Sequence, residues 1–124
     1  MPSKKIVVRD ESGKPFSSWL PDKKFSYIFE EAYPVMWGSC EPEYEFSDDR
    51  KWRIDFAWPG PKVGVEVDGF GFGHQAISAL TENHVKQNAA VEDGWKILRY
   101  TSKQLGSLQG IKDAVDQVAY VLCS

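Results

Sequence analysis

Three carboxylates, Asp55, Glu66 and Asp68, interrupt the most apolar stretch of the chain, the run RIDFAWPGPKVGVEVDG at residues 53–69. Burying an ionised carboxylate costs several kcal/mol, or raises its pKa until it takes up a proton, unless a positive charge compensates it. The compensating charge must come from Lys or Arg side chains elsewhere in the chain, or from a bound cation. These three residues are therefore the first candidates for a functional site.

The chain around these carboxylates predicts two strands, over residues 52–58 and 63–68, joined by a tight turn. Side chains alternate between the two faces of a strand, so the apolar residues can be grouped by position. One face of the strand pair then carries six of them: Ile54, Phe56, Trp58, Val63, Val65 and Val67. If Trp58 pairs with Val63, the register places Asp55 directly opposite Glu66.

Asp55 and Glu66 therefore face each other across the expected strand pair. Directly opposed residues have Cβ atoms about 4.5–5.5 Å apart, and like charges at that separation repel. Two ionised carboxylates so close call for a divalent cation or a shared proton, and oxygen ligands favour Mg²⁺ or Mn²⁺ over zinc. The alternative is an ion-pair network at the surface, in which Arg53, opposite Asp68, and Lys62 neutralise the carboxylates.

Length and composition limit the class of protein. The 124 residues are 42% hydrophobic and 14% aromatic, so residues 1–124 are expected to form a single folded domain. The formal net charge of −3 argues against a protein that coats nucleic acid with a basic surface. No run is long enough to span a membrane and the N-terminus lacks the apolar core of a signal peptide, so a cytoplasmic location is expected. Cys40 and Cys123 lack metal or disulfide spacing and are expected to be free thiols.

The remaining pattern predicts an α/β fold with the element order α-β-β-β-α-β-α. Residues 1–20 are expected to be a loosely attached arm with a short strand near residues 6–8. The other elements are a helix at 25–32 stopped by Pro34, strands at 44–46, 52–58 and 63–68, a helix at 76–93 ended by Gly94, a strand at 95–100 and an amphipathic helix at 111–122.

The helix at 76–93 has two faces that compete for the core. The more apolar face carries Ile77, Leu80, His84, Asn88 and Val91, which favours its burial and a buried, hydrogen-bonded His84. The other face carries small residues together with Asn83 and Lys86. Lys86 reaches the carboxylates only if this second face packs towards the strands.

Five short motifs, in this order, resemble the PD-(D/E)XK nuclease superfamily. They are WRIDFAWP, GVEVDG, a Gly-rich loop ending at His74, KQNAA at 86–90 and GWKILRYT. The similarity is nearest to small phage and bacterial proteins related to very-short-patch-repair nucleases, extends to Holliday junction resolvases, and runs from about residue 41 to 105. It implies a restriction-endonuclease-like core, with a central mixed sheet flanked by helices. It is also compatible with a phage-encoded protein.

The resemblance implies a metal site and a set of catalytic residues. Asp55, Glu66 and the backbone carbonyl of Val67 would hold Mg²⁺ or Mn²⁺. The superfamily's usual lysine is replaced by Asp68, a substitution also found in the similar small nucleases, and Lys86 matches the basic residue that those proteins carry on the next helix.

Two further positions depart from the resemblance. Asn83 stands where those relatives often carry an Asp. The relatives also place a Glu early in the first helix, for which Glu30 and Glu31, both late in the expected helix, are the candidates for an additional metal ligand.

The residues around the carboxylates could also contact a nucleic acid. His74 changes charge near neutral pH and is a candidate general base or phosphate-positioning residue, with an ordinary loop histidine as the alternative. Candidate DNA contacts are Arg53, Phe70, Phe72 and Arg99, since guanidinium groups bind phosphate and aromatic rings can stack on bases. The alternative for Arg99 is an ion pair with a neighbouring acid.

The expected function is that of a metal-dependent endonuclease that hydrolyses phosphodiester bonds in branched, mismatched or otherwise structured DNA. A junction resolvase would be a homodimer, because two symmetric cuts need two sites, whereas a mismatch-nicking enzyme could be a monomer. The alternative is a nuclease-fold module that binds DNA or a protein without cutting. Three features are compatible with this alternative: Asp68 in place of Lys, Asn83 in place of an acid, and the acidic net charge.

Overall fold

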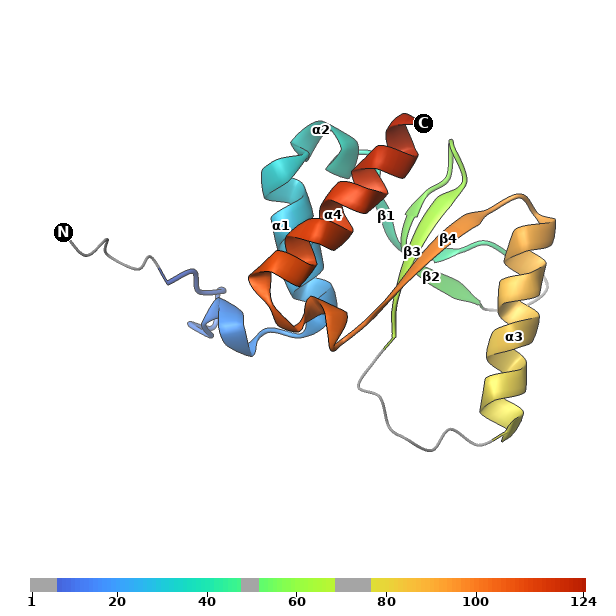
Figure 1. Ribbon diagram of the computed structural model, residues 1–124, viewed down its shortest axis with the longest axis horizontal. Coiled ribbons are helices and arrows are strands. Elements are labelled where there is room, and N and C mark those ends of the chain that lie inside the picture. Colours follow the sequence, from blue (N-terminus) through green and yellow to red (C-terminus); the bar gives the residue numbers. More distant parts are fainter. Residues whose placement is uncertain (1–6, 48–51, 69–76) are drawn as a thin grey trace.

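A computed structural model of the chain describes residues 7–47, 52–68 and 77–124. Within them, a four-stranded mixed sheet has helices on both faces (Figure 1). The strands follow the order β1-β2-β3-β4, with bounds Glu41–Glu45 (β1), Arg53–Trp58 (β2), Val63–Asp68 (β3) and Lys96–Thr101 (β4). The α/β class predicted from the sequence is confirmed.

The first three strands form an antiparallel meander, and β4 lies parallel to β3. A parallel pair needs a crossover connection, and here α3 (Ile77–Glu92) provides it. In Figure 1, α3 lies on one side of the sheet and the other helices lie on the opposite side. These are α1 (Pro21–Ala32), α2 (Pro34–Trp37) and α4 (Leu108–Cys123), with short 3₁₀ turns at Phe16–Ser18 (η1) and Gln104–Gly106 (η2).

The larger core lies between the sheet and the pair α1 and α4. Phe25 and Phe29 of α1 are fully buried against Phe56 and Trp58 of β2, with ring centroids 5.4 Å apart for Phe25–Phe56 and 5.2 Å for Phe29–Trp58. From α4, the apolar stripe Ile111, Val115 and Val118 closes this core, as its helical spacing predicts. Aromatic side chains dominate this packing, and each buries a large area.

The helix boundaries follow from local signals in the sequence. Pro21 begins α1, where a missing N–H costs nothing, and Pro34 prevents its continuation past Ala32. Gly94, with φ of +87°, ends α3 in the left-handed conformation that glycine adopts most easily. Ser107 caps α4 by accepting a hydrogen bond from the Gly110 amide at 3.0 Å.

The N-terminal segment differs from expectation in its described part. Residues 7–20 contain no strand of their own, only a single antiparallel bridge between Arg9 and Pro15. The expectation of a loose arm over residues 1–20 came from its polar composition. Trp19, however, is buried, and its ring lies 5.1 Å from that of Phe16 and 5.4 Å from that of Tyr27 on α1.

Strand β2 breaks the regular alternation that the sequence predicted. Phe56 and Trp58 face α1 and α4, but Ile54 lies in the opposite core with Ala57 and Trp95, on the α3 side. The grouping of Ile54 with Phe56 was therefore wrong. Glu43 stands next to this break on β1, opposite Asp55 in the register, and has an unusual φ of +52°. Irregularities of this kind re-aim side chains and occur often beside functional sites.

The two faces of α3 are also reversed relative to the first expectation. Leu80 is 43% exposed and Val91 is 67% exposed, and His84 is exposed rather than buried. The face that packs on the sheet carries Ala90 and the partly buried Lys86. Side-chain size explains this: Ala90 lets the helix approach Ile54 and Trp95 closely, while Lys86 reaches a carboxylate partner on β3.

Two predictions from composition can be compared with the described residues. Cys40 and Cys123 are both free thiols, and burial raises the pKa of Cys40 to about 12. Across the described residues, none of the helices has both the length and the apolar character needed to cross a bilayer.

Gly64 offers a test of the second core. A Cβ at this position would lie 2.8 Å from both Ile54 Cγ2 and Ile97 Cδ1, which cover the glycine on the α3 side of the sheet. We expect Gly64→Ala to lower the free energy of unfolding by about 1–3 kcal/mol through overpacking. Urea unfolding of the variant would measure this loss.

Gly60→Ala in the adjacent turn is the matched control, since a Cβ there would meet no atom within 4 Å. It should change the free energy of unfolding by less than about 0.5 kcal/mol. Equal effects of the two substitutions would contradict the packing of Ile54 and Ile97 over Gly64.

Candidate functional site

Asp55 lies where strands β2 and β3 cease to pair regularly. The register runs from Trp58–Val63 through Ala57–Gly64 to Phe56–Val65, as predicted, and its next step places Asp55 opposite Glu66. Instead of continuing the ladder, Asp55 accepts a hydrogen bond through Oδ2 from the Val67 amide at 2.8 Å. The carboxylate thus occupies a position between the two strands.

Burial raises the pKa of Asp55 above its usual value of 3.8. The nearby charges of Glu66 and Glu43 raise it further, while the Val67 amide and Lys86 act in the opposite direction. Burial outweighs these two favourable contacts. Asp55 is therefore a carboxylate whose negative charge is incompletely compensated by its described surroundings, and a bound cation would favour its ionised form.

Glu66 has two cationic neighbours. Lys86 Nζ lies 2.7 Å from Glu66 Oε1, and Arg99 Nη1 lies 3.6 Å from Oε2. The Glu66 side chain is 12% exposed and that of Lys86 is 18% exposed, so this pair is largely shielded from water. The position of Lys86 matches the conditional prediction made from the sequence, because the small-residue face of α3 does pack towards the strands.

Arg99 connects Glu66 with Asp68. It is the register partner of Glu66 on β4, and its Nη2 atom lies 2.8 Å from Asp68 Oδ1. Gln87, on α3 beside Lys86, turns its side-chain amide to the same guanidinium and can accept a hydrogen bond from it. Asp68, Lys86 and Arg99 therefore lie together around Glu66, and Arg99 pairs with neighbouring acids; the functional roles expected for these residues stay predictions.

The neutralising residues proposed from the register alone were wrong. Arg53 pairs with Glu45 of β1, at 3.4 Å, because β1 rather than β3 is its neighbour at that point. Lys62 Nζ lies 3.5 Å from Asp93 Oδ1 and donates a hydrogen bond to the Asp93 backbone carbonyl at 2.6 Å. These contacts connect the β2–β3 turn to the end of α3. The positive charges near Glu66 come from the α3–β4 half of the chain instead.

On its α1 side, Asp55 lines an open hollow of about 410 Å³. The charged residues in this hollow are Asp22 and Lys23 of α1, Glu43 of β1 and Asp55 itself. The first turn of α1 thus contributes an acidic residue near Asp55. Sequence reasoning missed Asp22, because an Asp in the first turn of a helix is usually explained by the helix dipole. Its position early in the first helix was the available signal.

Glu30 and Glu31 were the candidates for an additional metal ligand, and both are exposed on the later part of α1. Glu31 lines a different hollow, between α1 and α4, together with Lys112 and Asp116. The residues of α1 that share a hollow with Asp55 are Asp22, Lys23 and Ser26 in the first half of the helix. The structure does not bring Glu30 and Glu31 to the candidate site.

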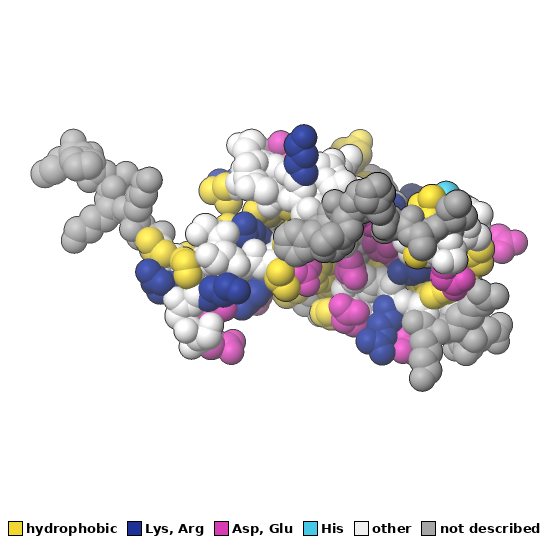
Figure 2. All heavy atoms as spheres, turned by 90° about the horizontal axis from the view of Figure 1, so that it is seen from below, with side chains coloured by type: hydrophobic (Ala, Val, Ile, Leu, Met, Phe, Trp, Pro, Cys, Tyr) yellow, Lys and Arg dark blue, Asp and Glu magenta, His cyan; other side chains and the backbone are white. Residues whose placement is uncertain are grey.

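Phe70, Phe72 and His74 lie outside the described residues, so their proposed roles stay predictions. Figure 2 views the molecule from the side on which β3 and β4 end. Carboxylate side chains gather near the middle of that face, with basic side chains among them.

The donor set fits Mg²⁺ or Mn²⁺ rather than zinc. Mg²⁺ is commonly held by one or two carboxylates together with water and substrate phosphates, and Asp55 and Glu66 are two such carboxylates. Within the described ranges, no three His, Cys, Asp or Glu side chains come close enough to hold one ion. A metal at this site would therefore complete its coordination with the Val67 carbonyl, water and substrate oxygens.

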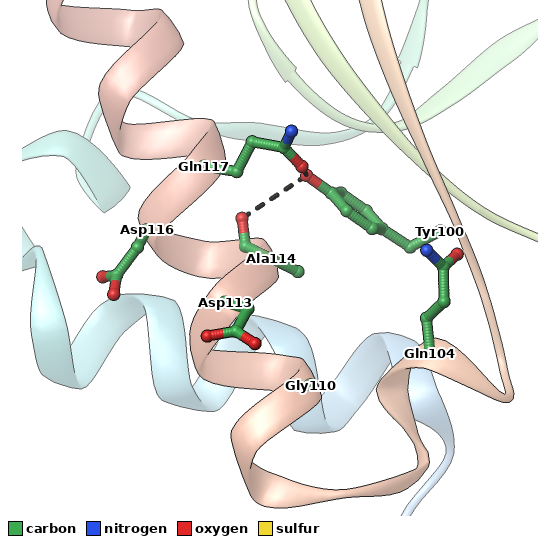
Figure 3. Close-up of a pocket in the computed structure, with 7 residues that line it drawn as sticks. All are labelled: Tyr100, Gln104, Gly110, Asp113, Ala114, Asp116 and Gln117. Atoms are coloured by element: carbon green, nitrogen blue, oxygen red, sulfur yellow. Dashed lines mark hydrogen bonds between the residues drawn. The ribbon is translucent and has the colours of Figure 1, made fainter.

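A larger hollow, of about 610 Å³, lies between η2 and α4 and contains none of the candidate residues (Figure 3). Its polar groups bond to one another and to neighbouring residues. Tyr100 donates to Gln117 Oε1 at 2.7 Å, and Asp116 accepts from Tyr33 at 2.8 Å. Burial raises the pKa of Tyr100 to about 12, so its hydroxyl stays protonated at neutral pH. We interpret this hollow as part of the packing between β4 and α4.

Comparisons of the chain with protein-family models, with curated proteins and with solved structures find no match.

Among the described residues, Asp55 is partly buried without a close cationic partner, whereas Glu66 has two, and this difference can be tested by measuring the stability of variants. The pKa of Asp55 is raised in the folded state, so its ionisation destabilises the fold. This penalty is absent below pH 3.8, grows as the pH rises through the raised pKa, and is complete above it. Asp55→Asn should therefore raise the melting temperature at pH 7, and the gain should shrink towards zero near pH 3.5. Thermal unfolding followed by circular dichroism across this range measures it.

Glu66→Gln is the contrasting variant at the same site. It removes the partner of Lys86 and Arg99 and should destabilise the protein by about 1–3 kcal/mol at pH 7, below the cost for a fully buried pair. A melting temperature that falls equally in both variants would show that Asp55 is as well compensated as Glu66, against the asymmetry described above.

Proposed function

We propose that the protein is a metal-dependent DNA endonuclease with a PD-(D/E)XK-like core. One observation carries the proposal: Asp55 lies where β2 and β3 stop pairing, near enough to Glu66 for that charge to raise its pKa, and Lys86 reaches Glu66 from α3. The antiparallel β1-β2-β3 meander followed by the parallel β3-α3-β4 unit supports the finer assignment of the core.

Asp55, Glu66 and the Val67 carbonyl would hold Mg²⁺ or Mn²⁺. Such an ion, when bound, lowers the pKa of a coordinated water and stabilises the negative charge that develops on a phosphate. The burial of Asp55 supports this role, because a partly dehydrated carboxylate beside a second acid gains more from a cation than from water. Asp22 and Glu43 extend the acidic surroundings on the α1 side.

Lys86 and Arg99 would bind phosphate oxygens of the DNA. The Lys86 side chain is 18% exposed and that of Arg99 is 27% exposed, and both form ion pairs with Glu66. The Arg99 fork suits the bidentate recognition of a phosphate, whereas Lys86 acts as a point charge. Asp68 and Gln87 would keep the guanidinium oriented in the absence of DNA.

The proposed substrate class is branched or mismatched duplex DNA. Cutting a four-way junction symmetrically needs two active sites and hence a homodimer, whereas nicking at a mismatch needs one. His74 remains the proposed general base, and Arg53, Phe70 and Phe72 remain proposed contacts to DNA.

A second candidate, a nuclease-fold module that binds DNA or a protein without cutting, rests on one observation. Glu66 is already paired with Lys86 at 2.7 Å and with Arg99 at 3.6 Å, so its carboxylate has cationic partners within the chain. In a binding module this ion-pair network would be a structural element. Metal dependence separates the two functions, because only hydrolysis requires Mg²⁺ or Mn²⁺.

The decisive experiment is cleavage of labelled DNA. Four-way junction, mismatched duplex, matched duplex and single strand would each be incubated with the protein in Mg²⁺, Mn²⁺ or EDTA. We expect cutting only with metal, and a loss of roughly 100-fold or more in rate for Asp55→Asn and for Glu66→Gln, because each removes a proposed metal ligand. Glu92→Gln, an exposed acid at the end of α3, is the control and should keep full activity.

Cutting in EDTA, or full activity in both site variants, would refute the metal site. Absence of cutting on every substrate by folded, metal-loaded protein would refute the endonuclease and favour the binding module. The preferred substrate would distinguish junction resolution from mismatch nicking.

The role of Lys86 can be tested separately. Lys86→Met keeps the aliphatic part of the side chain but removes the charge beside Glu66. We expect a rate loss of roughly 10²–10³-fold, typical for the removal of one group that stabilises transition-state charge. Lys96→Met, an exposed lysine at the start of β4, is the matched control. Single-turnover kinetics at saturating metal measures the effect, and equal rates for both variants would exclude Lys86 from the site.

A further inference from the structure

The positive charges of the chain are concentrated at its N-terminal end. Residues 1–24 contain six Lys or Arg and three Asp or Glu, a net charge of +3, whereas the other 100 residues contain nine and fifteen, a net charge of −6. A protein of net charge −3 that acts on DNA must still bind phosphates, and long-range repulsion opposes that contact. The N-terminal end is the part of the sequence best suited to overcome it.

The described part of this end is an ordered surface. The Asp10 carboxylate accepts hydrogen bonds from the amides of Ser12 and Lys14, at 3.0 and 2.8 Å, and these bonds fix the turn. Trp19 Nε1 then donates to the Lys14 carbonyl at 2.8 Å, which anchors the turn to the aromatic cluster on α1. Ordering these residues beforehand reduces the entropy cost when they bind a ligand.

The basic side chains of this segment lie beside aromatic rings. Lys23 Nζ is 4.7 Å from the Trp19 ring centroid and Lys24 Nζ is 5.8 Å from that of Phe16, distances suited to cation–π contacts. Arg9 and Lys14 are exposed on the same segment. We call the four residues Arg9, Lys14, Lys23 and Lys24 the basic surface. Figure 2 shows basic and hydrophobic side chains together at this end of the molecule.

The basic surface borders the candidate site. Lys23 lines the same hollow as Asp22, Glu43 and Asp55. It also pairs with Asp10 at 2.9 Å, so it joins the N-terminal turn to the rim of this hollow. A strand of DNA with one phosphate near Asp55 would therefore meet the basic surface with its neighbouring phosphates.

We propose that the basic surface binds the sugar-phosphate backbone of duplex DNA next to the Asp55 hollow. This inference rests on the proposed function for its partner, but it concerns binding and not hydrolysis. Lysine and arginine contacts to phosphates position a duplex without reading its sequence, and they release counterions, so the affinity falls steeply with salt. Lys14 is exposed and Lys24 is half-buried, and both contacts can be removed without breaking the Asp10–Lys23 pair.

The test measures DNA binding without cleavage. Fluorescence anisotropy of a labelled duplex in EDTA, between about 50 and 200 mM salt, gives the affinity and its salt dependence for the full chain. We expect Lys14→Gln/Lys24→Gln to weaken binding several-fold and to reduce the slope of log K against log salt by about 2, or about 1 for each phosphate that is no longer neutralised.

The matched control is Lys103→Gln/Lys112→Gln, which removes the same charge from exposed positions beside η2 and on α4. It should leave the slope unchanged, because the proposed contacts are local. Equal weakening in both double variants, or no measurable binding of the duplex by the wild-type protein, would overturn the proposal. So would binding of vesicles containing anionic lipid in place of DNA.

The outcome is separable from that of the cleavage assay. If the wild-type protein cuts no DNA but its binding depends on Lys14 and Lys24, the basic surface stands and the endonuclease fails. If the protein cuts DNA and the Lys14→Gln/Lys24→Gln variant binds like wild type, the endonuclease stands and the basic surface fails.

Discussion

A hydrogen bond of 2.8 Å between the Asp55 carboxylate and the Val67 amide lies at the junction of the two halves of the fold. Up to Phe56 and Val65, strands β2 and β3 pair in the register that buries their valine and aromatic side chains. Beyond that point the carboxylate of Asp55 takes the Val67 N–H, and Ile54 turns to the α3 side of the sheet. The second core around Ile54 follows from this change of direction, and on the same side of the sheet Lys86 of α3 and Arg99 of β4 complete the polar site around Glu66.

The two carboxylates at this point illustrate different solutions to the cost of burial. Glu66 is stabilised by Lys86 and Arg99, which arrive from later elements. Asp55 has a backbone amide at hydrogen-bond distance and Lys86 as a more distant charge, and these do not offset its burial. An incompletely compensated acid beside a compensated one lowers stability, and such destabilisation is characteristic of sites kept for function.

The sequence predicted the element order and the β2–β3 register, because apolar periodicity and the short turn leave few alternatives. It also placed Glu66 and Lys86 as candidates that meet if the small-residue face of α3 packs inward. The position of Ile54 could not be predicted, since the break in β2 accompanies the positive φ of Glu43 on the neighbouring strand. The choice of the α3 face failed because apolar content alone ignores the need of Glu66 for a cation.

The same network explains why a metal site and an ion-pair network need not exclude each other. Lys86 and Arg99 already pair with Glu66, so its carboxylate oxygens can exchange one cationic partner for another. A divalent cation bound between Asp55 and Glu66 would weaken the ion pair between Glu66 and Arg99, because the cation and the guanidinium compete for the same Glu66 oxygens. A DNA phosphate would then offer Arg99 a replacement partner. On the proposed function, metal and DNA would therefore each favour the binding of the other, through a coupling that is reciprocal by thermodynamic necessity.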